Sequence, residues 1–96
     1  MQRDDVLKLL TNKRATLAAM GVKSIALFGS VARNEGRPDS DLDFLVEFDG
    51  HATYEGYLRV KSSLEEWLGR RIDLVTRRAV KPRLRARIEA EAIYVA

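Results

Sequence analysis

The sequence contains no cysteine, which excludes disulfide bonds and metal sites built from thiolates. It has no apolar run near the roughly 18–20 residues of a membrane helix, so no membrane partner is expected. The N-terminal segment MQRDDVLKLL is acidic where a secretory leader would be basic, so no signal peptide is expected. Internal repeats and low-complexity tracts are also lacking. These absences predict a cytoplasmic protein.

The length and composition fit one small domain. Of the 96 residues, 46% are hydrophobic and 32% are charged, as in an ordinary globular protein. A chain this short buries roughly 60–68% of its unfolded surface, which is enough for one core. We therefore predict a single domain over residues 1–96.

The net charge of +3 is unevenly distributed. Between Arg70 and Arg87 there are eight basic residues and one acid, Asp73, whereas the stretch from Glu35 to Glu66 is rich in acids. This distribution suits an anionic partner or substrate at the C-terminal end. A solvated helix face that binds nothing is the simpler explanation, and the sequence leaves both open.

The spacing of apolar residues predicts an α/β domain with one sheet and about three helices. Helices are expected at Arg3–Met20, Thr53–Leu68 and Pro82–Glu91, and strands at Lys23–Phe28, Asp41–Phe48 and Arg71–Thr76. In the last helix, Leu84 and Ile88 are expected to face inward. One helical turn is expected at Ser30–Arg33, a turn-rich loop at Asn34–Ser40 and a short apolar tail at Ile93–Val95.

Two aspartates open the strand DLDFLVEF. Side chains alternate across a strand, so Asp41 and Asp43 share one face, with Cβ atoms about 6.5–7 Å apart. Asp73 interrupts the apolar run of another predicted strand. If the two strands pair, three carboxylates could converge, and oxygen-only ligation of this kind suits Mg²⁺ in a two-metal site.

Gly29 and Ser30 follow the first predicted strand. A glycine there lets the backbone approach a ligand closely, and the Ser30 hydroxyl can donate to a phosphate oxygen. Phosphate-binding groups at one strand end and carboxylates on a neighbouring strand predict nucleotidyl transfer. In that reaction a hydroxyl attacks the α-phosphate of a metal-bound triphosphate, and pyrophosphate leaves. Arg33 could reach phosphates as well, or could pair with Glu35, Asp39 or an acidic partner.

The stretch GSVARNEGRPDSDLDFLVEF resembles the DNA polymerase beta-like nucleotidyltransferase superfamily, and within it the minimal nucleotidyltransferase (MNT) antitoxins. The resemblance covers about Lys23 to Val75, and the ending EAIYV is also similar. It implies the small mixed sheet of the polymerase beta-like fold. The family usually has glycine where this chain has Asn34, and asparagine tolerates a left-handed backbone, so we expect the turn to be kept.

The resemblance also implies the roles of the site residues. Gly29 and Ser30 would bind the triphosphate of ATP, and the three aspartates would be the catalytic residues and the ligands of Mg²⁺: Asp41, Asp43 and Asp73. By analogy, Asp73 would take the proton of the attacking hydroxyl.

MNT proteins are typically encoded beside a HEPN-domain toxin, which is an RNase. The resemblance therefore implies an antitoxin that binds such a toxin and transfers AMP from ATP to a toxin tyrosine. Larger members of the superfamily have extra domains that hold their acceptors. This chain has room for little besides the catalytic sheet and its helices, which suits a protein acceptor.

Three other hypotheses stay open, in descending order. The chain could be an antitoxin that masks its toxin sterically, without catalysis. It could bind nucleic acid through the Arg-rich C-terminal region, with steep salt dependence, although that leaves the three carboxylates unexplained. It could also be a free-standing nucleotidyltransferase for a small-molecule acceptor, although no second domain is present to form an acceptor pocket.

Overall fold

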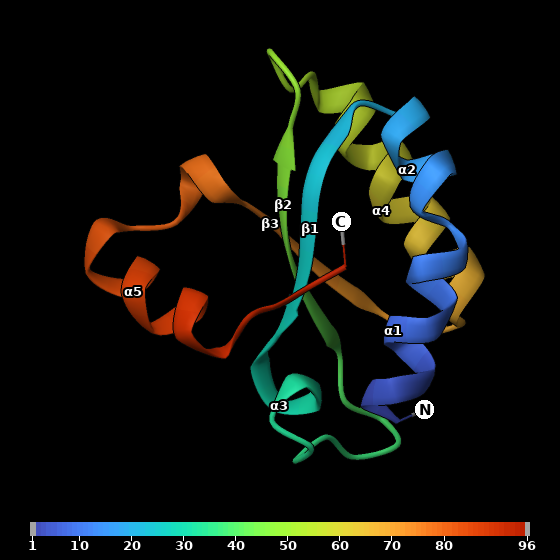
Figure 1. Cartoon of the computed structure of the whole chain (residues 1–96), viewed down its shortest axis with the longest axis vertical. Helices are drawn as coiled ribbons and strands as arrows, with labels where there is room; N and C mark the ends of the chain where they lie inside the picture. The colour runs from blue at the N-terminus through green and yellow to red at the C-terminus, as the bar shows by residue number, and fades with distance from the viewer. Residues whose placement is uncertain (1, 96) are drawn as a thin grey trace.

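A four-stranded mixed sheet forms the centre of the structure, a computed structural model that describes residues 2–95 (Figure 1). Its strands are β1 (Val22–Phe28), β2 (Leu42–Phe48), β3 (Ile72–Thr76) and β4 (Ile93–Tyr94). The strand order is β3-β2-β1-β4. β2 is parallel to β3 and antiparallel to β1, which is also antiparallel to β4. The predicted small mixed sheet is confirmed, and the expected C-terminal tail is its fourth strand.

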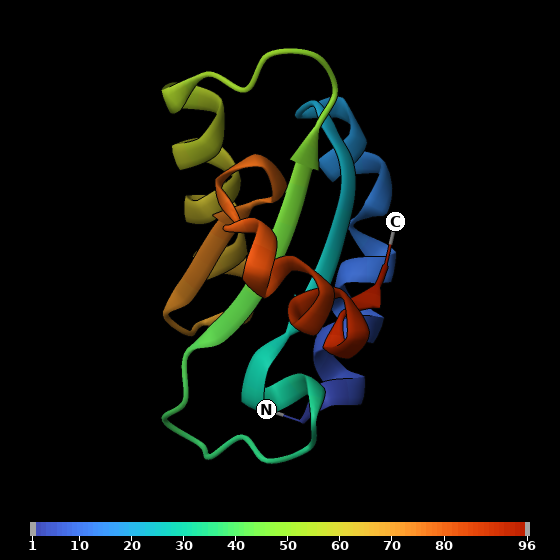
Figure 2. The ribbon, with the colours of Figure 1, turned by 90° about the vertical axis from the view of Figure 1, so that its left-hand side faces the viewer.

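Helices cover both faces of this sheet (Figures 1 and 2). Residues 2–95 form five α-helices and one 3-10 turn, namely α1 (Arg3–Asn12), α2 (Arg14–Ala19), α3 (Gly29–Ala32), α4 (Tyr54–Leu68), η1 (Arg77–Ala79) and α5 (Pro82–Glu91). The helices α1, α2 and α4 lie on one face, and α5 crosses the other. No helix within residues 2–95 is both long and apolar enough to span a membrane.

The prediction of one helix over Arg3–Met20 is wrong, because the helix divides at Lys13. In an unbroken helix, positions 13 and 14 would lie on the same side as the buried Leu10, and both are charged. Lys13 instead leaves the helical conformation, with φ −100° and ψ 7°. Its ammonium lies 5.2 Å from the centre of the Trp67 ring, at cation–π distance.

Each face of the sheet carries its own apolar cluster. The β2 residues Leu42, Phe44 and Val46 are fully buried under α1, α2 and α4, in the larger cluster. Leu45 faces the other way and belongs to a smaller cluster with Ala26 and Val80. Because side chains alternate along β2, Asp43 lies on the side of the smaller cluster.

The helix α5 packs only loosely on this smaller cluster. Ile88 packs against the cluster as expected, but no residue of α5 is fully buried. Leu84 is 41% exposed, so the prediction that it faces inward is wrong. The smaller cluster has three buried members, and among the residues of α5 it is Ile88 that packs against it.

Tyr57 connects α4 to the strand that carries Asp73. Its hydroxyl donates a hydrogen bond of 2.6 Å to the carbonyl oxygen of Leu74, in a partly buried position. β3 is an edge strand, so this bond satisfies a carbonyl group at the margin of the sheet. The bond therefore helps to hold β3, and Asp73 with it, against the helical layer.

Tyr57→Phe is expected to lower the free energy of unfolding by about 1 kcal/mol, because it leaves the Leu74 carbonyl without its donor. In a domain of this size the unfolding midpoint should fall by several degrees. Tyr54→Phe is the matched control, because Tyr54 is 76% exposed on the same helix. Equal midpoints for the two variants in thermal unfolding would contradict the role given to the bond.

Candidate active site

The candidate active site lies where β1 ends and where β2 and β3 begin, beside α3 at the lower end of Figure 1. In the ladder, Asp43 is the partner of Phe28 in β1 and of Asp73 in β3. Partners in a ladder point to the same face of the sheet. The two acid-bearing strands do pair, which is the condition on which the convergence of the carboxylates depended, and Asp41 lies just before the first residue of β2.

Gly29 brings the backbone at the end of β1 against the Asp43 carboxyl group. A Cβ atom added at Gly29 would lie 2.9 Å from Cγ of Asp43 and 3.1 Å from its Cβ. The φ angle of Gly29 is +77°, a conformation that other residues rarely adopt. Both the contact and the conformation therefore require glycine at this position.

Burial, together with neighbouring negative charge, raises the pKa of Asp43 to about 6. Burial is the largest cause, followed by the charge of Asp73, a hydrogen bond between the two side chains and the charge of Asp41, while the charge of Arg33 acts in the opposite direction. A hydrogen bond between two carboxyl groups requires a proton between them. The site therefore favours a bound proton or another cation.

Asp41 forms a salt bridge with Arg71. Its Oδ1 lies 3.1 Å from Nε of Arg71, in an exposed position. The next backbone N–H, of Leu42, donates to the Arg71 carbonyl oxygen at 3.0 Å. Arg71 thus fixes the start of β2 through both its side chain and its backbone.

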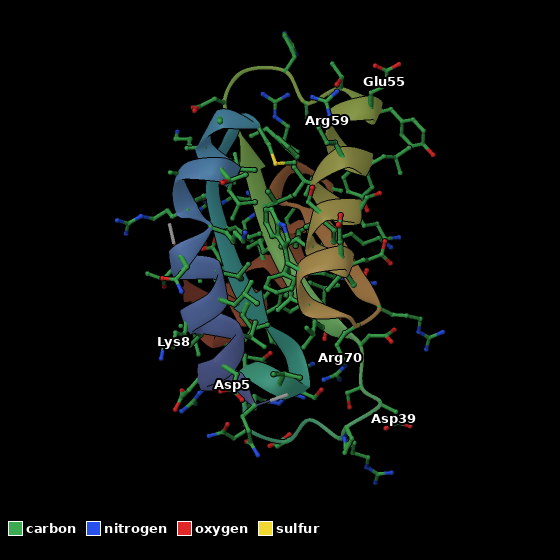
Figure 3. All side chains as sticks on the ribbon, turned by 90° about the vertical axis from the view of Figure 1, so that its right-hand side faces the viewer. Asp5, Lys8, Asp39, Glu55, Arg59 and Arg70 are labelled. Atoms are coloured by element: carbon green, nitrogen blue, oxygen red, sulfur yellow. The ribbon has the colours of Figure 1, made fainter. Side chains whose placement is uncertain are left out.

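Arg70 holds the loop that leads into β2 (Figure 3). Its guanidinium donates to the carbonyl oxygens of Arg37 and Ser40. Arg70 and Arg71 were expected only as members of the basic C-terminal stretch, and their contacts with the start of β2 were not predicted. Their position could have indicated such a contact, because Arg70 and Arg71 stand between Gly69, which ends α4, and the strand that carries Asp73.

Arg33 connects α3 to α5. It forms salt bridges with Glu35 at 3.1 Å and with Glu91 of α5 at 2.9 Å. The expected pairing with Glu35 is confirmed, and the hydrogen bond to Glu35 is the main cause that raises the pKa of Arg33. The partner Glu91 was missed, because nothing in the sequence indicates a contact between residues 58 positions apart. A contact of Arg33 with phosphate stays a prediction.

The turn after α3 has the predicted backbone conformation. Asn34 has a φ angle of 59° and is the one non-glycine residue with positive φ among residues 2–95. Its N–H donates to the carbonyl oxygen of Val31, which closes the helical turn. The substitution of asparagine for the usual glycine therefore preserves the turn.

The carboxylates are close together but do not form a complete set of metal ligands. Within residues 2–95, no group of three or more His, Cys, Asp or Glu side chains is arranged to hold a metal ion. Asp43 and Asp73 are in contact, whereas Asp41 is paired with Arg71. The chemistry nevertheless fits Mg²⁺, because the donors are carboxylate oxygens whose mutual repulsion a divalent cation would relieve. Metal ligation by the three aspartates stays a prediction.

A cavity of about 450 Å³ lies at the opposite end of β2. Its lining includes Lys23, Glu47, His51, Arg77 and Arg78 and none of the predicted site residues. Glu47 is four residues from Asp43, or roughly 13 Å along the strand. We place the candidate active site at the carboxylates, because the cavity lining mixes acids with basic residues, and its Glu47 is paired with Arg77 at 3.5 Å.

Gly29→Ala is expected to destabilise the fold much more than Gly21→Ala. Both glycines have positive φ, but the Gly21 position has open space around a Cβ atom, whereas the Gly29 position meets Asp43. The two variants share the backbone strain of about 1 kcal/mol, and only Gly29→Ala adds the collision. Thermal unfolding measures the difference.

A double-mutant cycle isolates the collision at Gly29. In an Asp43→Ala background, the carboxyl group is absent and only the Cβ contact at 3.1 Å is left, so the additional effect of Gly29→Ala should fall substantially toward that of Gly21→Ala. An unchanged effect in that background would show that the Asp43 side chain is not what excludes alanine.

Asp43→Asn is expected to raise the unfolding midpoint by a few degrees at pH 7.5 in the presence of EDTA. The pKa of Asp43 is about 6 in the folded chain against an ordinary value of 3.8, so the folded chain holds the proton more tightly than the unfolded chain. The wild type therefore loses relative stability as the pH rises between these two values. The advantage of the variant should grow through this window and level off above it.

The control for this prediction is Asp39→Asn, in the exposed loop before β2. It removes the same charge at a distance from the pair and should not reproduce the pH dependence. Unfolding midpoints measured from pH 4 to pH 8 test both variants, and a flat difference between Asp43→Asn and wild type would contradict the electrostatic account.

Known proteins share the sequence family and the fold of this chain. A family profile described as "Nucleotidyltransferase domain" matches residues 8–95. "Protein adenylyltransferase MntA" of Thermococcus cleftensis is 33% identical over 87 residues, covering 91% of this chain and 88% of the relative. A Methanocaldococcus jannaschii protein, provisionally named a protein adenylyltransferase, is 44% identical over 77 residues, covering 77% of each chain.

Solved structures have the same fold. One, described provisionally as a minimal nucleotidyltransferase, has a TM-score of 0.84 and 41% identity and covers 97% of this chain and 95% of its own. The MNT antitoxin bound to a tri-AMPylated HEPN toxin of Shewanella oneidensis has a TM-score of 0.67 at 20% identity, covering 94% and 71%, which shows similarity of fold alone. The chain therefore belongs to the nucleotidyltransferase-domain family, as a minimal nucleotidyltransferase, and the predicted enzyme class is confirmed.

Proposed function

We propose that this chain is an antitoxin that transfers AMP from ATP to a tyrosine of a HEPN-domain RNase toxin. The observation that carries the proposal is the contact of Asp43 with both Asp73 and the Gly29 backbone. It places the carboxylates, which could bind a metal, next to a backbone segment that could bind phosphate. The relatives named as protein adenylyltransferases support AMP transfer to a protein.

Structural neighbours support the choice of partner. Structures of the same fold are described as toxin–antitoxin complexes, one of them with AMP-PNP and another with a tri-AMPylated HEPN toxin. AMP-PNP is an ATP analogue, so it supports ATP as the donor. The toxin in the second complex carries the modification that this chain would introduce.

The phosphates of ATP would bind at the end of β1. The glycine at position 29 lets the phosphates approach the backbone, and the Ser30 hydroxyl donates to a phosphate oxygen. Arg33, which directly follows α3, adds a positive charge nearby. Its partner Glu35 is exposed, so a phosphate can replace this carboxylate in the salt bridge at little cost.

Asp41, Asp43 and Asp73 would hold Mg²⁺, which when bound neutralises charge on the phosphates and favours ionisation of the acceptor hydroxyl. The salt bridge between Asp41 and Arg71 is exposed, so it contributes little and does not prevent Asp41 from acting as a ligand. The raised pKa of Asp43 belongs to the chain without a cation. A cation would lower it and favour the charged carboxylate.

Asp73 would accept the proton of the attacking tyrosine. It is exposed at the beginning of edge strand β3, where a protein acceptor can approach it. The tyrosine oxygen forms a bond to the α-phosphorus, the bond from that phosphorus to the bridging oxygen breaks, and pyrophosphate leaves. The positioning of these groups supplies the rate enhancement.

The test is intact-mass analysis of a co-expressed HEPN toxin after incubation with this chain, ATP and Mg²⁺. We expect mass steps of AMP on the toxin, mapped to tyrosine by fragmentation, and loss of its RNase activity. Asp43→Asn should abolish the mass steps, because it removes a proposed metal ligand. Asp49→Asn, at the other end of β2, is the matched control and should retain them.

Two outcomes would contradict the proposal. A toxin that is bound and silenced without any mass step would indicate an antitoxin that acts sterically. A toxin that is neither bound nor modified, while a small hydroxyl compound accepts AMP, would indicate a free-standing nucleotidyltransferase.

A further inference from the structure

Five exposed basic side chains lie on and just before α5: Arg78, Lys81, Arg83, Arg85 and Arg87. None of them forms a salt bridge with another residue of the described range 2–95. We call these five residues the basic face. Like charges this close repel one another, so the basic face does not stabilise the isolated fold.

The acids of α5 are already paired elsewhere. Glu91 pairs with Arg33 at 2.9 Å, and Glu89 pairs with Arg77 at 2.7 Å. Both glutamates therefore serve contacts to α3 and to η1. These glutamates therefore do not neutralise the basic face, which can bind an anionic group of another molecule.

The basic face leads toward the candidate active site. Arg83, Arg87 and Glu91 are spaced four residues apart, so they follow one another along one side of α5. Glu91 ends this row at Arg33, which follows α3 directly. Figure 2 shows α5 crossing the sheet face with α3 close below it, and the two helices are in contact.

Exposed apolar side chains accompany the charges. Leu84, between two of the arginines in sequence, is 41% exposed, and Tyr94 is 46% exposed. Tyr94 is the ladder partner of Ala26, so it points to the side of the sheet that α5 covers. Arginine mixed with tyrosine is typical of protein–protein interfaces.

We propose that the basic face binds an acidic segment of the acceptor protein and so brings its hydroxyl group to the carboxylates. This inference rests on the proposed function and specifies the chemistry of the partner. Charge complementarity selects an acidic surface, and the apolar side chains favour a protein over a nucleic acid. The row ending at Arg33 gives the bound segment a direction, toward Gly29 and Asp43.

The test uses Arg83→Glu/Arg87→Glu with the HEPN toxin as the acceptor. The KM for the toxin should rise about tenfold or more, while kcat and the KM for ATP are retained, because the change affects docking alone. The wild-type KM for the toxin should also rise with salt, and the variant should lose most of that dependence.

The matched control is Lys8→Glu/Arg14→Glu, on the helices of the opposite face (Figure 3 labels Lys8). Both positions are exposed, and the double change lowers the net charge by the same amount. The control should keep a KM for the toxin close to that of the wild type. An equal rise in both double variants would assign the effect to net charge and would overturn the proposal.

Direct binding separates this inference from the proposed function. One possible outcome is that the wild type binds the toxin without transferring AMP, and that only the basic-face variant loses this binding. That outcome would contradict the proposed function but support the basic face as the binding site for the toxin. Unchanged toxin binding and KM in the variant would overturn the basic face. The wild type could instead bind a labelled RNA that the variant no longer binds, while the KM for the toxin is unchanged. That result would show that the basic face binds nucleic acid and would overturn the proposal.

Discussion

The contact of Asp43 with Asp73 across the parallel β2–β3 ladder is the constraint around which the site is arranged. Two carboxyl groups in contact repel, so the contact must be imposed by the rest of the sheet. Leu42, Phe44 and Val46 impose it from the opposite face, where all three are fully buried. A shift of β2 by one residue would expose these side chains, and each is worth about 1.5–3 kcal/mol when buried.

The arginines near the Asp43–Asp73 pair form salt bridges whose acidic partners could be replaced by a ligand. Arg33 and Arg71 flank the carboxylates, and each is engaged in exposed salt bridges with acids. Such pairs contribute little to stability, so phosphates and a cation can replace their members at little cost. In the free chain, the pKa of Asp43 is raised. A bound cation would neutralise the carboxylates and reduce their mutual repulsion.

Much of this arrangement could be predicted from the sequence because it follows from local periodicity. Alternation along β2 separates the buried Leu42, Phe44 and Val46 from Asp43, and Asp73 stands out within its apolar strand. The pairing of Asp43 with Asp73 itself, and the approach of the Gly29 backbone, depend on strand register, which the sequence indicated only conditionally. The break at Lys13 lacked a local signal such as proline or glycine.

The features of α5 were the least predictable, because they depend on how one helix packs against a small apolar area. The spacing of Leu84 and Ile88 suggests two inward residues, yet the smaller cluster accommodates only Ile88. The salt bridge of Glu91 with Arg33 likewise joins segments distant in the sequence. These contacts divide the charges of α5 into acids used by the fold and the basic face left for a partner.

A crystal structure of the chain grown with Mn²⁺ and a non-hydrolysable ATP analogue would show most directly whether the Asp43–Asp73 pair binds the metal. Anomalous scattering locates the metal without assumptions about its ligands. We expect a peak bound by the Asp43 and Asp73 carboxylates, with the analogue's phosphates beside Gly29 and Ser30. Phosphates bound elsewhere, for example in the cavity near His51, with no peak at Asp43, would contradict it.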